Sequence, residues 1–264
     1  MKISHEVPLN LLEFSLKFNN YDYCLPHLLD KFDQYRDYFT NAKKQGRYII
    51  MDNSLHELGQ AYDTDRLMHW IEVLKPDEFI VPDVWEEAEK SIDNATEWSN
   101  IKLPKDTLKV AVVQAKNIEE AATCYKSYQA LGYRKIAFSY GAGYYSELVP
   151  HPTRAIATAL GRVYVVSKLY NDDIISKHDR VHLLGCAVPQ EFIYYKDMPF
   201  IETIDTSNPI MAGLEGISYN NWGLDSKPML KIDEAMEWSV DQIKEKWAFV
   251  WNNVMDFKVI NNIK

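Results

Sequence analysis

Polar side chains that could take part in catalysis stand at the ends of several apolar segments of this chain. Four of them, Asp52, Asp83, Gln114 and Asp205, each end a segment with the character of a buried strand. In a barrel of parallel strands such positions converge on one cavity. Two carboxylates that face each other across a small pocket can act at an anomeric carbon, one as nucleophile and one as general acid and base. Each aspartate alone could instead cap the next helix or hold a turn.

The elements that must position these residues are predicted from hydrophobic patterning. Short apolar runs, several of them β-branched, indicate strands that are buried on both faces. These runs lie at Lys2 to Val7, Arg47 to Asp52, Glu78 to Asp83, Lys109 to Gln114, Arg134 to Ser139, Arg180 to Gly185 and Phe200 to Asp205. Between them, apolar residues recur at three- and four-residue spacings that predict helices, as in Leu67, Trp70, Ile71 and Leu74.

An α/β fold follows from this alternation, and we expect a (β/α)8 TIM-type barrel. The distance from Asp52 to Asp83 is 31 positions, as is that from Asp83 to Gln114, which is about one strand-helix unit each. An eighth strand is predicted near Leu214 to Tyr219, and a C-terminal helix over about 232–255. The alternative, a doubly wound open sheet, would want a glycine-rich phosphate turn after an early strand, and none follows Val7 or Asp52.

The composition is that of a globular protein, which we interpret as one domain over residues 1–264. The chain has 47% hydrophobic and 25% charged residues, and its formal net charge of −9 argues against wholesale coating of nucleic-acid phosphates. Three scattered cysteines give no zinc-site spacing, so no metal is expected, and they favour a reducing, cytoplasmic setting. We find no signal peptide and no membrane-spanning stretch in the sequence.

Six segments in order resemble the signature motifs of the tRNA-guanine transglycosylases, which are (β/α)8 barrels that exchange guanine for a 7-deazaguanine. They are MDNSLHELG, IVPDVWEE, VAVVQAKN, IAFSYGAG, HLLGCAVPQEF and ETIDTSNP. The resemblance implies that Asp205 is the nucleophile and Asp52 the general acid and base. It further implies that the base is bound by Asp83, Gln114, Ser139, Gly141 and Gly185, and stacks on His56 and Leu184. No cofactor is implied.

Departures from that family bear on the substrate. No cysteine follows Cys186, so the family's zinc subdomain has no counterpart here, and Ile210-Met211 replaces its Thr-Arg pair. The chain is therefore more similar to the compact DNA-guanine transglycosylases of phages, which would place it in the host cytoplasm. The resemblance then implies DNA and a free 7-deazaguanine base, similar to preQ0, as partners. Two alternatives stay open: an enzyme that acts on tRNA, and a non-catalytic accessory subunit that binds nucleic acid.

Nucleic-acid contacts are expected from a locally basic segment. Between Tyr125 and His182 the chain carries eight basic and four acidic residues, leaving the remainder at −13. We predict backbone contacts from Arg134, Lys135 and Arg154, with Tyr144 and Tyr145 stacking on an unpaired strand. The alternative is a solvated helix face, because the charges are not strictly periodic.

Overall fold

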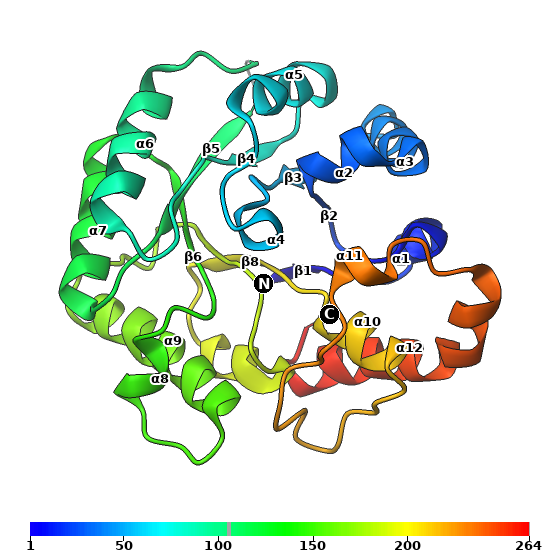
Figure 1. Cartoon of the computed structure of the whole chain (residues 1–264). Helices are drawn as coiled ribbons and strands as arrows, with labels where there is room; N and C mark the ends of the chain where they lie inside the picture. The colour runs from blue at the N-terminus through cyan, green and yellow to red at the C-terminus, as the bar shows by residue number, and fades with distance from the viewer. Residues whose placement is uncertain (105–106, 264) are drawn as a thin grey trace.

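Eight short parallel strands surround a common axis, with helices arranged around them (Figure 1). The computed structural model describes residues 1–104 and 107–263. The strands are β1 (Lys2–Ser4), β2 (Asp22–Cys24), β3 (Ile49–Met51), β4 (Glu78–Ile80), β5 (Leu108–Val113), β6 (Lys135–Phe138), β7 (Val181–Leu183) and β8 (Ile201–Asp205). They are hydrogen-bonded in the order β1-β8-β7-β6-β5-β4-β3-β2. The chain is a (β/α)8 TIM-type barrel, as the sequence predicted.

Between β1 and β2 the barrel is closed by a few single hydrogen bonds, two of them to side chains, instead of by a regular ladder. Asn20 spans this gap: its backbone N–H donates to the Ile3 carbonyl at 2.9 Å and its Oδ1 accepts from the Ile3 N–H at 3.0 Å. The Tyr23 N–H then donates to Ser4 Oγ at 3.1 Å. Because β1 also pairs with β8 in a register that sets Ser4 beside Asp205, the carboxyl ends of these strands lie together.

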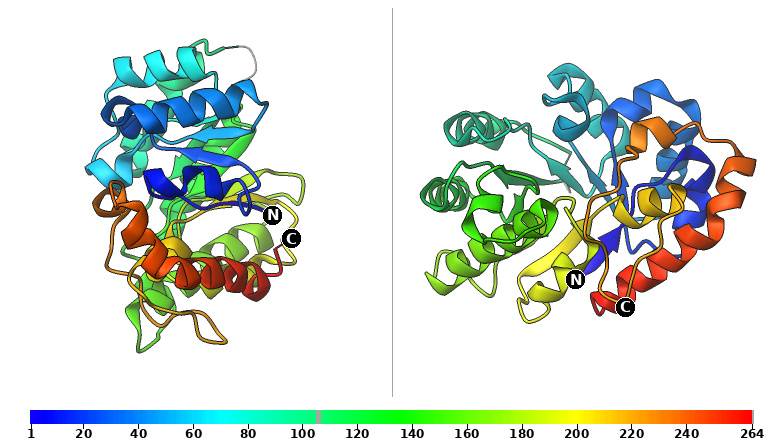
Figure 2. Two further views of the ribbon diagram at one scale, coloured as in Figure 1. Left: turned by 90° about the vertical axis from the view of Figure 1, so that its right-hand side faces the viewer. Right: turned by 60° about the horizontal axis from the view of Figure 1, so that its bottom comes forward.

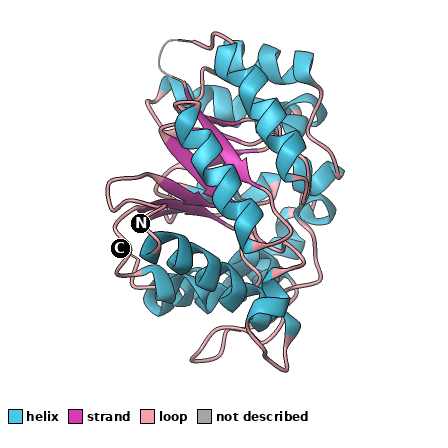
Figure 3. Cartoon of the chain, turned by 90° about the vertical axis from the view of Figure 1, so that its left-hand side faces the viewer, coloured by secondary structure: helices cyan, strands magenta, loops and turns pink. Residues whose placement is uncertain are grey.

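Helices cover the outside of the strands (Figure 3). They are α1 (Leu12–Ser15), α2 (Pro26–Lys31), α3 (Asp33–Lys44), α4 (Leu55–Leu58), α5 (Thr64–Leu74), α6 (Ala88–Asn100), α7 (Ile118–Ala130), α8 (Tyr145–Leu148), α9 (Arg154–Asn171), α10 (Asn208–Leu214), α11 (Ile232–Ala235) and α12 (Val240–Ile260), with 3-10 turns at Leu9–Leu11 and Pro189–Tyr195. Side-chain caps start several of them, because the first N–H groups of a helix lack partners. Asp63 caps α5, Asn117 caps α7 and Ser239 caps α12. Within residues 1–104 and 107–263, no helix combines the length and the apolar character needed to cross a membrane.

Two predicted elements were wrong. The segment near Leu214 to Tyr219 is not the eighth strand, since α10 runs to Leu214 and the chain then turns. The missed strand is β2, in which Tyr23 and Cys24 follow Asp22 without an apolar run long enough to show in the sequence. The helix predicted over 232–255 is two helices, α11 and α12, of which α12 packs along α10 and continues to Ile260 (Figure 2).

The amino-terminal end of the barrel is closed by buried ion pairs. Lys135 begins β6, and its Nζ lies 2.6 Å from Glu78 Oε2 with both side chains essentially inaccessible. Arg180 reaches the other oxygen of Glu78 at 3.1 Å and pairs with Glu202 at 2.8 Å. The buried carboxylate of Glu78 is therefore paired with Lys135 on one oxygen and with Arg180 on the other. These side chains occupy the amino-terminal end of the barrel, and the cavity lies at the opposite, carboxyl end.

Candidate active site

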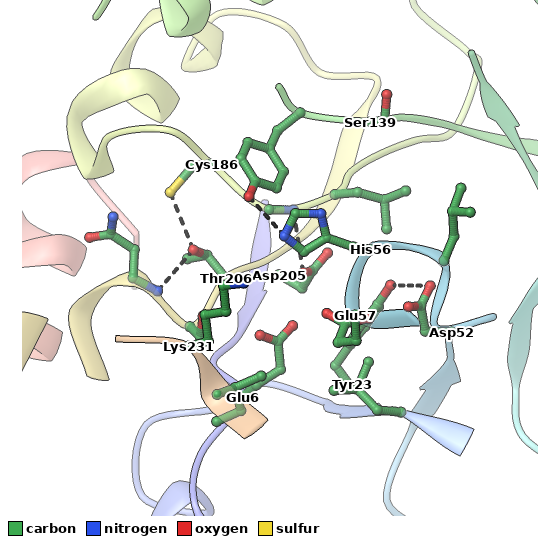
Figure 4. Close-up of a pocket in the computed structure, with 18 of the residues that line it drawn as sticks. Glu6, Tyr23, Asp52, His56, Glu57, Ser139, Cys186, Asp205, Thr206 and Lys231 are labelled. Atoms are coloured by element: carbon green, nitrogen blue, oxygen red, sulfur yellow. Dashed lines mark hydrogen bonds between the residues drawn. The ribbon is translucent and has the colours of Figure 1, made fainter. Parts of the chain in front are cut away.

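A cavity of about 480 Å³ opens at the carboxyl ends of the strands, where the following loops converge (Figure 4). This volume is in the range of small-molecule binding sites. Six acidic side chains line it: Glu6, Asp52, Glu57, Asp83, Asp205 and Asp233. Of the residues predicted to bind a base, Gln114, Ser139, Gly185, Leu184 and His56 also line it. Gly141 does not: it turns with φ 78° beside the ring of Trp85, outside the lining.

Asp205 is the last residue of β8 and is almost fully buried. Its Oδ1 lies 2.9 Å from His182 Nε2, and its Oδ2 accepts the Gly185 N–H at 3.3 Å. Burial lowers the pKa of His182 to about 3, so this imidazole is neutral. When Asp205 is ionised it can only accept, so Nε2 then carries the proton and Nδ1 accepts from Thr203 Oγ1 at 2.8 Å. Burial, with the nearby charge of Asp52, raises the pKa of Asp205 to about 7.

Glu6 stands next to Asp205, and the sequence had not singled it out as a reacting group. It follows Ser4, which is paired in register with Asp205, by two positions, and the two carboxyl groups lie close enough to shift each other's pKa. Burial first, and then the charge of Asp205, raises the pKa of Glu6 well above its ordinary value. Glu6 therefore keeps its proton to a higher pH than an exposed glutamate does. The sequence shows a carboxyl group just after the first strand, but it does not show that Asp205 lies beside this group.

Asp52 begins the turn between β3 and α4. Its Oδ2 accepts the Ser54 N–H at 3.1 Å, which forms an Asx-type turn. The turn that the sequence left open as an alternative role for this aspartate is therefore present. Its Oδ1 accepts the hydroxyl of Tyr23 at 3.0 Å, and the side chain still faces the cavity. The Tyr23 ring stacks on His182 with centroids 5.8 Å apart, which links the surroundings of Asp52 and Asp205. Burial raises the pKa of Asp52, which favours a group that holds a proton and releases it.

Asp83 is held by two amide groups instead of capping the next helix. Asn53 Nδ2 donates to its Oδ1 and Gln114 Nε2 to its Oδ2, each at 2.6 Å. Gln114 Oε1 in turn accepts the Glu86 N–H at 3.2 Å and lies 3.5 Å from Ser139 Oγ, which fixes the amide orientation. Burial raises the pKa of Asp83 to about 7. Each oxygen keeps a second acceptor site, so the carboxylate is set to accept two parallel N–H bonds from a ligand. Asn53 was not among the predicted site residues.

The loop after β7 is shaped by a buried arginine. Arg162 donates to the carbonyls of Leu184 at 2.6 Å and Gly185 at 2.7 Å, and its Nε lies 2.6 Å from Glu191. Gly185 has φ 54°, and a Cβ at this position would lie 2.5 Å from the ring of Tyr140. The absence of a side chain therefore lets Tyr140 approach while the Gly185 N–H points at Asp205.

Aromatic rings form one side of the cavity mouth. Tyr140 Oη lies 3.0 Å from His56 Nε2, and the ring of His56 has its centroid 6.1 Å from that of Trp85, which is 36% exposed. Burial and the nearby charges of Lys227 and Lys231 lower the pKa of His56 to about 4, so the ring is neutral at pH 7. A neutral flat ring here is suited to stacking against a heterocycle.

Three of the five predicted nucleic-acid contacts, Lys135, Tyr144 and Tyr145, are buried, and those predictions were wrong. Lys135 is buried in the ion pair with Glu78, and Arg134, although exposed, precedes it at the amino end of β6, away from the cavity. Tyr144 and Tyr145 are buried beneath the loop, with 9% and 1% of their surface exposed, so their rings pack rather than stack on a ligand. Arg154 is exposed at the start of α9, and its contact stays a prediction.

Within the part of the chain that the structure describes, no group of three or more His, Cys, Asp or Glu side chains is arranged to hold a metal ion. His56 and Glu57 lie side by side in α4, but Gln60 stands where a second ligand of a zinc-protease motif would be. The function must be argued from the geometry of the cavity, because no known family model and no curated protein matches the sequence.

Proposed function

We propose that the protein is a base-exchange transglycosylase that replaces guanine in DNA by a 7-deazaguanine base, with Asp205 as the covalent nucleophile. The observation that carries this proposal is the arrangement in one cavity of a buried, hydrogen-bonded Asp205, a second proton-holding carboxyl at Asp52, and a carboxylate at Asp83 oriented by two amides. The type of reaction is suggested by the resemblance of six ordered segments to the motifs of the guanine transglycosylases. The geometry of the cavity allows each of these side chains a chemical role in such a reaction.

Recognition of the base is assigned to Asp83 and Gln114. Guanine and 7-deazaguanine present an N1–H and an exocyclic amine side by side, which match the two oxygens of the Asp83 carboxylate. Adenine and cytosine lack this pair of donors, and a buried carboxylate left without them is penalised. Since Asn53 and Gln114 already occupy one acceptor site on each oxygen, they fix the plane in which the base must lie.

Exchange then proceeds through two displacements at C1′. A carboxylate oxygen of Asp205 forms a bond to C1′ while the bond from C1′ to N9 of guanine breaks, and Asp52 gives its proton to the departing base. The incoming 7-deazaguanine returns a proton to Asp52 as its N9 bonds to C1′, and the ester bond to Asp205 breaks. Atoms and protons balance, and no co-reactant is required.

Glu6 and His182 prepare the nucleophile. The His182 Nε2–H donates to ionised Asp205, which favours the ionised form, and a Glu6 that keeps its proton adds no second negative charge beside it. Because the nucleophile must be ionised and the pKa of Asp205 is about 7, the rate of the first displacement is expected to rise with pH through about 7 and to fall again where Asp52 loses the proton that it must donate.

The test is a base-exchange assay with separate substrates. Labelled guanine is offered together with single-stranded DNA, duplex DNA or tRNA, and the nucleosides are identified by mass spectrometry after digestion. We expect label in DNA with the wild-type protein and none with Asp205→Ala, while Asp93→Ala, which removes an exposed carboxyl on α6, keeps the activity. Label in tRNA alone would replace the substrate, and no label in any nucleic acid, or label unaffected by Asp205→Ala, would overturn the proposal.

A further inference from the structure

A segment between α10 and α11 contributes residues to the lining of the cavity, and we call its residues 224–231 the strap. Figure 1 shows the course of the chain from α10 to α11. The strap is tied at both ends. Gln190 Nε2 donates to the Leu224 carbonyl at 2.7 Å and its Oε1 accepts the Leu224 N–H at 3.1 Å, while the Leu230 N–H donates to Glu215. Between these ties, Lys227 and Met229 are exposed, yet both also line the cavity.

Two lysines of the strap face a cavity that is otherwise acidic. Lys227 donates to the Tyr140 hydroxyl, and its Nζ lies 4.5 Å from the centre of the Tyr140 ring. Lys231 also lines the cavity and is close enough to His56 to lower the pKa of that ring. Among residues 1–104 and 107–263, neither lysine has a carboxylate within 4.0 Å, whereas Lys43, Lys116 and Lys168 are each paired.

We propose that Lys227 and Lys231 bind the phosphates on either side of the target nucleotide, and that the strap is the surface by which the protein holds a DNA strand. The inference rests on the proposed function, since it takes C1′ of the target to lie at Asp205. When the base of the target nucleotide lies against Asp83 and its sugar at Asp205, the strand on either side of it must run out through the mouth of the cavity. The two flanking phosphates are then the anions nearest to the strap.

The arrangement of charge supports this ligand over a free base. A 7-deazaguanine base without its sugar carries no phosphate and needs no cation at the mouth, because its N–H donors are matched by Asp83. A nucleic-acid strand needs cations for its phosphates and flat groups for neighbouring bases. Tyr140, His56 and Trp85 supply such groups beside Lys227, with the His56 and Tyr140 centroids 5.2 Å apart.

This placement replaces the contact surface that was predicted from the charge of the chain. The segment between Tyr125 and His182 is basic, but Lys135 is buried and Arg162 is used inside the fold. Lys227 and Lys231 belong to the part of the chain with a strong excess of acidic residues, and six of its 34 acidic residues line the same cavity.

The test measures binding of a fluorescently labelled single-stranded oligodeoxynucleotide with one guanine, by anisotropy over a range of salt concentrations. The variants are Lys227→Gln, Lys231→Gln and the double variant, with Arg134→Gln as a control that removes the same charge at the opposite end of the barrel. A phosphate contact to a single strand contributes about 0.7 to the slope of log affinity against log salt. The double variant should therefore lose about 1.4 from this slope, so that between 50 and 200 mM salt the wild type loses about sevenfold more affinity. Arg134→Gln should match the wild type.

A second measurement separates this inference from the proposed function. Binding of free guanine is measured by the quenching of tryptophan fluorescence. Its affinity should be equal in the wild type and in all three lysine variants, and equal affinity also shows that the variants fold. An unchanged salt slope in the double variant would overturn the proposed phosphate site. So would a loss of guanine affinity in this variant that is as large as its loss of DNA affinity. If the slope falls as expected but no base exchange occurs with DNA, the phosphate site stands and the exchange reaction is wrong.

Discussion

Replacing the nucleophile by its amide should make the protein more stable at alkaline pH while it abolishes exchange. Asp205→Asn keeps the shape of the side chain and an acceptor for the His182 Nε2–H, and it places an amide NH2 where Oδ2 accepts the Gly185 N–H. In the wild type, Asp205 has a pKa of about 7, above the value of about 3.9 expected in an unfolded chain. Between these two values the folded protein binds a proton that the unfolded chain has lost, so the stability of the wild type decreases as the pH rises through this window.

The size of the effect follows from the same two values. From pH 5 to pH 8, linkage gives a loss of about 3 kcal/mol in the free energy of unfolding from Asp205 alone. The asparagine does not titrate, so the stability of Asp205→Asn relative to the wild type should rise by about this amount over the same interval. Groups remote from Asp205 titrate alike in both proteins and cancel in the difference, whereas the pKa of Glu6 is less raised in the variant because the charge of Asp205 is gone, which adds to the effect in the same direction.

The assay is urea denaturation followed by circular dichroism at pH 5 and pH 8. Asp93→Asn serves as the matched control, because Asp93 is exposed on α6 and the same substitution should leave the difference near zero. If the relative stability of Asp205→Asn is the same at both pH values, or falls at pH 8, Asp205 is not a buried carboxyl with a raised pKa and the reasoning fails.

Three further variants address separate parts of the account. Asp83→Asn turns one acceptor into a donor against the base, and the affinity for free guanine should fall by a factor of about 100 or more, measured by equilibrium binding; unchanged affinity would remove Asp83 from recognition. Glu6→Gln keeps a neutral polar group beside Asp205 and should retain most of kcat, whereas Glu6→Leu should lose about tenfold or more, and equal rates in the two would show that a polar group at this position has no role. Lys135→Met removes one partner from the buried pair with Glu78 at the far end of the barrel, so thermal denaturation should show a loss of up to about 3 kcal/mol while guanine affinity per folded molecule is kept; a selective loss of affinity would contradict this structural role.

The sequence was sufficient for the elements whose signal is local. The strand runs that end in Asp52, Asp83, Gln114 and Asp205 are apolar and bounded by turns, and all four residues line the cavity. The strand β2 was missed because Asp22, which is buried in a pair with Arg47 at 2.8 Å, interrupts the apolar pattern that would mark it.

Residues whose role depends on a partner across the barrel could not be identified in this way. Glu6, Asn53 and His182 act through Asp205 or Asp83, which are between 23 and 199 positions away along the chain, and no local spacing reports such contacts. The charge count failed for a related reason. A cation at the start of a strand and one on a loop after it lie at opposite ends of the barrel, as Lys135 and Lys227 do.

The central claim is that Asp205 forms a bond to C1′ of the target nucleotide. It is tested most directly by mixing the protein with a guanine-containing oligodeoxynucleotide, quenching under denaturing conditions and mapping the modified peptide by mass spectrometry. We expect an adduct on Asp205 that carries the oligodeoxynucleotide without its guanine, that is absent from Asp205→Asn and that disappears when a 7-deazaguanine base is added. Base exchange that continues at the wild-type rate in Asp205→Asn, with no adduct in either protein, would contradict it.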